Sequence, residues 1–153
     1  MPNGITHFRT TLAILPVATI VTFAKTNDIG ISMAIGAGCL VGTLVSCDLD
    51  VDGGNYSYYL VRRVTGNIGS FLWGVFWWPY AVVVPHRSTI SHFPVISTII
   101  RATYLLIPII IIMMLLKIPL PTTISPLWTW AFLGLCLSDL LHIILDAFWK
   151  QKQ

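Results

Sequence analysis

The sequence predicts an all-α integral membrane protein with four transmembrane helices and one aromatic-rich segment, about 68–85, that is interfacial or re-entrant. Two observations support this fold class. Of the 153 residues, 56% are hydrophobic and only 10% are charged, whereas a soluble domain carries about 25% charged residues. The apolar residues also form stretches of about 20, the length that crosses a bilayer as a helix. We expect a single membrane domain over 1–153.

Four stretches are long and apolar enough to span, and we expect helices at about 9–25, 29–47, 94–117 and 126–149. The first lacks the basic start and the cleavage site of a signal peptide, so we interpret it as a membrane helix. The second is rich in small residues, which let helices approach closely. The proline-rich "IPLPTTISP" predicts a short, stiff turn between the last two.

The stretch 68–85 is ambiguous by hydropathy alone. It is apolar enough to span, yet it holds Trp73, Trp77, Trp78 and Tyr80 around Pro79. Trp and Tyr favour the headgroup level of a membrane. Hydropathy therefore leaves a span and an interfacial segment both open.

The cysteines and the net charge exclude several function classes. Cys39, Cys47 and Cys136 show no C-x-x-C spacing, so we interpret them as small buried hydrophobes rather than disulfide or zinc-thiolate partners. The net charge of +3 indicates membrane topology, because no basic patch interleaved with aromatic residues is present. Nucleic acid is not an expected partner.

Acids and histidines are scarce and, apart from Asp28, fall in four clusters. These are "THF" at 6–8, "CDLDVD" at 47–52, "HRSTISH" at 86–92 and "SDLLHIILD" at 138–146. Ionisable groups inside a membrane protein are costly and usually functional. The clusters therefore predict where function lies.

The last cluster carries the strongest signal. Asp139, His142 and Asp146 are spaced i, i+3, i+7 and lie on one stripe of an otherwise apolar helix. Such a stripe cannot face lipid. It forms either an inward polar network between helices or a metal or catalytic site, since carboxylate and imidazole are ligands for zinc, manganese or iron.

The other clusters are weak motifs by themselves. We expect Asp48 and Asp50 on the same side of an extended segment, with Asp52 as a further acid. His86 and His92 are six residues apart, which fits a loop better than one helix face. His7 alone is typical of an ordinary interface residue.

Membrane topology tests whether the clusters form one site. If 68–85 spans, they divide between two sides separated by about 30 Å of hydrocarbon. If it does not, all of them gather on the side of the N-terminus, and we adopt this arrangement. That side then carries most of the basic residues and Lys25 and Lys117 lie opposite, so both termini are predicted to be cytoplasmic. The basic residues on the N-terminal side are Arg9, Arg62, Arg63, Arg87, Lys150 and Lys152.

These clusters in this order resemble a family of small bacterial membrane proteins described as uncharacterised metal-binding proteins. That family is related to the LexA-regulated, membrane-bound metal-dependent hydrolases. The resemblance covers nearly the whole chain: His7, "CDLD", "WWPYAVVVPHRSTISH" (77–92), "IIRATYLL" (99–106) and the D-x-x-H-x-x-x-D at 139–146. Cys47 departs from it, because the family tends to have proline there. The resemblance implies metal binding and suggests hydrolysis.

We therefore predict a metal-dependent hydrolase at the cytoplasmic face of a bacterial-type plasma or internal membrane. It would hold one or two divalent ions, with zinc as the leading candidate and manganese or iron as alternatives. The predicted direct ligands are Asp48, His86, His92, His142 and Asp146. Predicted ligands or supporting residues are His7, Asp50 and Asp139. Either Asp50 or Asp139 would serve as general base.

Two arginines extend this prediction to a substrate. Arg87 and Arg101 are natural anion partners, which favours a phosphoester or a lipid-linked substrate. For Arg101 the alternative is a salt bridge to Asp139 or Asp50. Two other functions stay open: a non-catalytic metal-binding subunit of a larger membrane complex, and a metal or proton transporter. In each case the lipid bilayer is a partner, and other membrane proteins are candidate partners.

Overall fold

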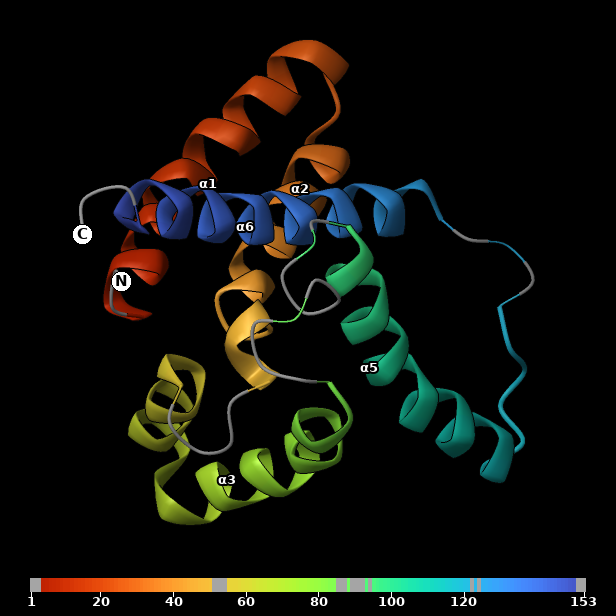
Figure 1. Ribbon diagram of the computed structural model, residues 1–153. Helices are drawn as coiled ribbons and strands as arrows, with labels where there is room; N and C mark the ends of the chain where they lie inside the picture. The colour runs from red at the N-terminus through yellow and green to blue at the C-terminus, as the bar shows by residue number, and fades with distance from the viewer. Residues whose placement is uncertain are drawn as a thin grey trace.

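The structure is a computed structural model that describes residues 4–50, 55–84, 88, 93, 95–121, 123 and 125–150, without the side chains of Asp50 and Lys150. Within these residues the chain is helical and contains no strand, which confirms the all-α fold class. Figure 1 shows the arrangement. The elements are α1 (Gly4–Thr26), α2 (Ile29–Gly42), the short 3-10 helix η1 (Cys47–Asp50), α3 (Tyr56–Val83), α5 (Ile96–Leu115) and α6 (Pro126–Lys150).

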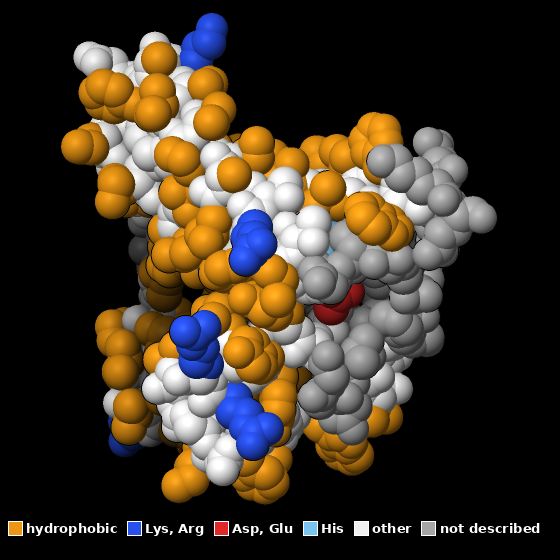
Figure 2. Space-filling model, turned by 90° about the vertical axis from the view of Figure 1, so that its left-hand side faces the viewer, with side chains coloured by type: hydrophobic (Ala, Val, Ile, Leu, Met, Phe, Trp, Pro, Cys, Tyr) orange, Lys and Arg blue, Asp and Glu red, His pale blue; other side chains and the backbone are white. Residues whose placement is uncertain are grey.

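Four segments of the described chain are long and apolar enough to cross a membrane: Gly4–Thr26, Ile29–Leu49, Ile96–Leu115 and Pro126–Trp149. They match the four predicted spans to within a few residues. In the most apolar window of Ile96–Leu115 only 11% of residues are buried. Large apolar side chains therefore cover much of the outer surface, as Figure 2 shows for one face. Such a surface suits lipid contact.

The first two spans form a tight helical hairpin. Asn27 adopts a left-handed φ of 51°, and the Asp28 carboxylate caps α2 by accepting a hydrogen bond from the Ile31 amide at 3.0 Å. Gly36 of α2 lies against Thr19 and Leu15 of α1. The two helices are therefore antiparallel, and the start of α1 lies beside the end of α2.

The contact between α2 and α6 depends on small residues, as predicted for the second span. A side-chain carbon at Gly38 would lie 1.9 Å from the carbonyl oxygen of Ala131, and one at Gly42 would lie 2.4 Å from Ser138. Backbones can approach this closely only where no side chain intervenes. Since Gly38 faces Ala131 and Gly42 faces Ser138, both helices run in the same sense and end on the same side.

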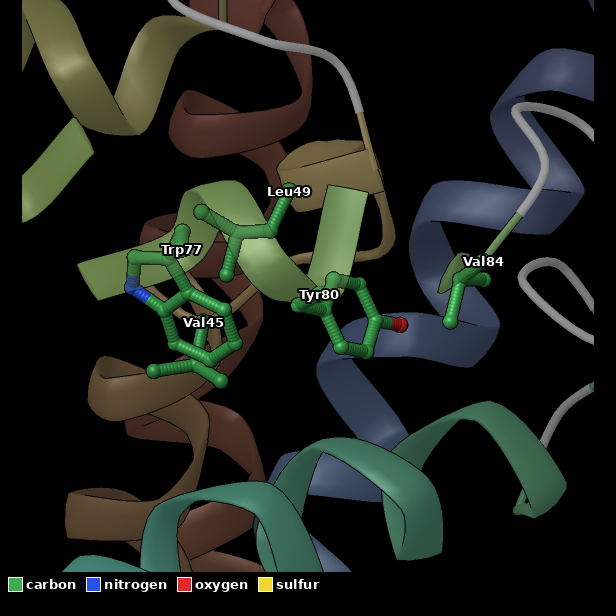
Figure 3. Packing of buried hydrophobic residues seen from close by; sticks show 5 residues of the cluster. All are labelled: Val45, Leu49, Trp77, Tyr80 and Val84. Carbon is green, nitrogen blue, oxygen red and sulfur yellow. The ribbon is translucent and has the colours of Figure 1, made fainter. Parts of the chain in front are cut away.

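The aromatic-rich segment is the second half of α3, a helix that begins at Tyr56 and kinks at Gly66, whose φ of 74° favours glycine. The described chain offers four candidate spans, and α3 is not among them. Trp77 and Tyr80 instead pack on Val45, which lies between α2 and η1, and on Leu49 in η1 (Figure 3). This contact keeps the aromatic segment beside the end of the second span.

Two local expectations were wrong. The first helix begins at Gly4 rather than near residue 9, which brings His7 into the helix. The "CDLD" segment is a turn of 3-10 helix rather than an extended strand. The prediction that Asp48 and Asp50 share a side rested on an extended segment, and the side chain of Asp50 lies outside the described residues.

Candidate metal centre

Three elements meet at one end of the molecule and bring four acid and histidine side chains together. His7 comes from the second turn of α1, Asp48 from η1, and His142 and Asp146 from the last turns of α6. The start of α1 and the end of α6 lie close together on this side in Figure 1. The convergence follows from the hairpin of α1 and α2 and from the shared direction of α2 and α6.

His142 is at the centre of this group. Its Nε2 lies 3.4 Å from Oδ1 of Asp48 and 3.6 Å from Oδ2 of Asp146. His7 stacks on the His142 ring with the ring centroids 3.7 Å apart, and its Nε2 lies 3.3 Å from Oδ1 of Asp146. Both imidazoles are buried. Two buried, stacked rings that face carboxylates are well placed to act as neutral ligands.

Hydrogen bonds hold η1 in place beside α6. The Asn55 side chain caps α3 by accepting from the Tyr58 amide at 2.8 Å, and it also donates to the carbonyl of Asp48 at 3.3 Å. The Ser57 hydroxyl donates to the carbonyl of Leu44 at 2.6 Å. These bonds tie the start of α3 to the end of the second span and so position Asp48.

The donors form two overlapping groups, each of which could hold a metal ion. His7, His142 and Asp146 make one group, and Cys47, Asp48 and His142 make the other. Within each group one donor atom per residue lies within 4.8 Å of the others. Beside them is a cavity of about 20 Å³, lined by His7, Asp48, Asp139 and His142 among others. That volume accommodates about one water molecule.

The donor set fits a transition-metal ion. The nitrogen–oxygen distances of 3.3–3.6 Å are longer than good hydrogen bonds of about 2.7–3.2 Å. Two donors bound tetrahedrally at about 2.1 Å are separated by about 3.4 Å. In addition, Nδ1 of His7 is buried without a hydrogen-bond partner among the described residues. Imidazole, carboxylate and thiol donors at such separations are typical of zinc and similar ions.

Comparison with protein families supports this chemistry. Residues 2–153 match the family described as "Uncharacterized metal-binding protein (DUF2227)". The chain belongs to this family. Comparisons with curated proteins and with solved structures find no match. Metal binding is therefore the property that the family and the donor geometry share.

In this metal-binding protein Asp139 has a different environment from the other acids. Its Oδ2 accepts hydrogen bonds from the Thr98 hydroxyl and from Nη2 of Arg101, both on α5. Arg101 and Asp139 are almost completely buried. The salt bridge that we gave as the alternative for Arg101 is therefore present. Asp139 lies outside both donor groups found in the described chain, but it lines the same cavity.

Several predicted site residues lie outside the described residues. These are His86, Arg87 and His92, together with the side chain of Asp50. The residues that flank "HRSTISH" can be placed. Val84 packs in the cluster that contains Leu49 of η1, and Thr98 bonds to Asp139. The chain therefore leaves α3 and enters α5 at the end of the molecule where Asp48 lies.

Sequence reasoning missed Cys47 and Thr98. Cys47 was interpreted as a small buried hydrophobe, and it is buried, but it also belongs to a donor group that the sequence did not indicate. Its position directly before Asp48 is the signal that could have identified it. Thr98 carries no such signal, because its role depends on how α5 packs against α6.

Proposed function

We propose that this metal-binding protein is a metal-dependent hydrolase that works at the cytoplasmic face of a membrane. The observation that supports the proposal most is the position of the small cavity, which lies directly beside the converged donors His7, Asp48 and His142. A hydrolytic ion needs protein ligands on one side and room for water on the other. The relation that we expect between this family and the membrane-bound metal-dependent hydrolases favours the same reaction class.

The chain's own residues have distinct roles in this proposal. His7, Asp48, His142 and Asp146 would hold the ion, which when bound would supply Lewis acidity and lower the pKa of a water molecule. Asp139 accepts the proton. Thr98 and Arg101 hold its Oδ2, while Oδ1 has no hydrogen-bond partner among the described residues. The fixed carboxylate thus keeps one oxygen for a water in the cavity.

The substrate proposed is a phosphoester, in free or lipid-linked form. The Nε and Nη1 atoms of buried Arg101 have no hydrogen-bond partner among the described residues. These spare donors belong to the partner of Asp139, which lines the cavity, and they would suit an anionic group that reaches them. The cytoplasmic placement rests on the excess of Lys and Arg on the side of the site.

Particular observations bear on two other functions. A non-catalytic subunit of a membrane complex is favoured by the burial of His7, Cys47 and His142, because a structural ion is enclosed by protein. A transporter would need ionisable groups toward both faces. At the opposite end Asp28 serves as the cap of α2, which leaves it a structural role.

An open coordination position distinguishes hydrolase from structural subunit. We would load the purified full-length protein with Co²⁺ and record its visible spectrum while adding inorganic phosphate. A hydrolytic centre should show a spectral change that saturates with phosphate, together with turnover of bis(p-nitrophenyl) phosphate that is lost in His142→Gln. A spectrum that phosphate leaves unchanged would indicate a closed ion and favour the structural role.

A further inference from the structure

Cys47 is buried beside the polar donors of the metal centre. Its side chain is fully buried, and it opens η1 directly before Asp48. Its neighbours Val45 and Leu49 belong to the apolar cluster with Trp77, but Cys47 is not part of that cluster. Its sulfur instead lies within 4.8 Å of a ring nitrogen of His142. The 3-10 turn thus directs Leu49 toward the aromatic helix and Cys47 toward the metal centre.

The other two cysteines provide a comparison within the same chain. Cys39 lies on α2 where Gly134 of α6 approaches its backbone, and Cys136 is half-buried on α6 near Thr98. Neither belongs to a donor group found in the described chain. All three are free cysteines. Cys47 is therefore distinguished by position, since its sulfur lies within 4.8 Å of donor atoms of both Asp48 and His142.

The two donor groups share His142, and this shared residue suggests how many centres exist. Nε2 of His142 is the atom that lies near both Asp48 and Asp146. A neutral imidazole binds one ion through one nitrogen. The two groups are therefore better understood as two sides of one centre than as two separate sites.

We infer that Cys47 binds this ion as a thiolate, beside His142 and Asp48. The inference rests on the proposed metal centre and adds a ligand to it. Coordination replaces the S–H bond with a sulfur–metal bond, and the proton is released to solvent. Thiolate is a soft ligand that favours zinc over magnesium or calcium. The chemistry of Cys47 therefore gives the centre a preference for a zinc-type ion.

X-ray absorption at the zinc edge tests the inference directly, because it detects the ligand without any assay of activity. The full-length protein loaded with Zn²⁺ should show a sulfur neighbour at about 2.3 Å in addition to nitrogen and oxygen at about 2.0–2.2 Å. The sulfur signal should persist in the Cys39→Ser/Cys136→Ser double variant, in which Cys47 is the remaining cysteine. This result does not depend on whether a Cys47 variant folds.

The Cys47→Ser variant tests whether the sulfur neighbour and tight zinc binding depend on this residue. It should lose the sulfur neighbour and bind Zn²⁺ at least about tenfold more weakly, a loss that even residues supporting a ligand can cause. Cys136→Ser is the matched control and should keep both. If wild-type protein binds Zn²⁺ through nitrogen and oxygen alone, the role of Cys47 is wrong while the metal centre stands. If wild-type protein binds no Zn²⁺, the metal centre and the role of Cys47 are both wrong.

Discussion

Two groups of ionisable side chains lie along α6, and they are neutralised differently. Asp139 is paired with a cation from the protein itself, the buried guanidinium of Arg101. One to two turns later, Asp146 and His142 face His7 and Asp48. Among the described residues no Lys or Arg contacts Asp146. The same helix thus carries one acid with its own counterion and a second group that consists of metal-ligand types.

This difference shows how burial and composition define a metal centre. A buried carboxylate needs a compensating charge, because desolvation costs several kcal/mol. Arg101 provides it for Asp139, so that pair is complete without an ion. The second group contains imidazole and carboxylate donors at separations suited to a metal, and an ion would compensate its acids. The comparison predicts that the Arg101–Asp139 pair stabilises the fold without metal. The group around His142 should stabilise it when a metal ion is bound.

The largest effect is expected from replacing Arg101, which is the counterion of Asp139. Arg101→Met leaves Asp139 buried without its partner, which should lower the free energy of unfolding by about 3–5 kcal/mol. Denaturation of detergent-solubilised protein measures this change. The double variant Arg101→Met/Asp139→Leu should recover most of the loss. The distinction between the groups fails if Arg101→Met is no more harmful than Arg62→Met, since Arg62 is exposed.

The second effect concerns stabilisation by metal. Zinc at 100 times its dissociation constant should stabilise the wild-type protein by about 2.7 kcal/mol, because it binds the folded state. His142→Gln removes the donor that both groups share, so this stabilisation should disappear. Thermal unfolding with and without Zn²⁺ provides the measurement. An equal gain in His142→Gln would mean that zinc binds elsewhere.

A third prediction separates the two groups through helix packing. Gly38→Ala places a carbon against the Ala131 carbonyl and forces α2 away from α6, at a cost of about 1–3 kcal/mol. Zinc affinity should fall because Asp48 follows α2, while the Arg101–Asp139 pair between α5 and α6 remains. Equilibrium denaturation and zinc titration measure both quantities.

Gly74→Ala is the matched control for that substitution. A side-chain carbon at Gly74 would lie 3.5 Å from the nearest atom of Tyr58, an ordinary contact. It should leave stability and zinc affinity unchanged or slightly improved. If Gly38→Ala behaves like Gly74→Ala, the close approach of α2 and α6 does not support the site.

The smallest effect is expected at the opposite end of the molecule. Asp28→Ala removes the cap of α2 and should cost about 1 kcal/mol. Zinc affinity should stay the same, since Asp28 lies at the far end of the hairpin from His7. A zinc titration of this variant checks the claim, and a loss of binding would argue that both ends of the protein handle metal.

Much of the fold follows from the sequence because the bilayer limits the choices. Apolar stretches of about 20 residues have to be helices in lipid. The stripe of Asp139, His142 and Asp146 has to face inward, and the small residues of the second span indicate a close helix neighbour. These arguments need only spacing and residue type, and the structure confirms four helices long and apolar enough to span, together with the inward stripe.

The rest depends on packing between segments that are distant in sequence. Arg101 was given two roles, and the salt bridge to Asp139 depends on the contact of α5 with α6, which spacing does not indicate. The role of Cys47 depends on a 3-10 turn, which residue spacing did not indicate. His7 gains its significance from an earlier helix start and from stacking on His142. Spacing indicates which residues share a face, but not which partner each residue meets.

The central claim is that the group around His142 holds a divalent ion. Elemental analysis of the purified full-length protein tests it most directly, with Asp28→Asn as the control for an acid outside the site. We predict a stoichiometric divalent transition metal, zinc first, in the wild-type and Asp28→Asn proteins, and its loss in His142→Gln. Wild-type protein without bound metal, or His142→Gln protein with the wild-type content, would contradict the claim.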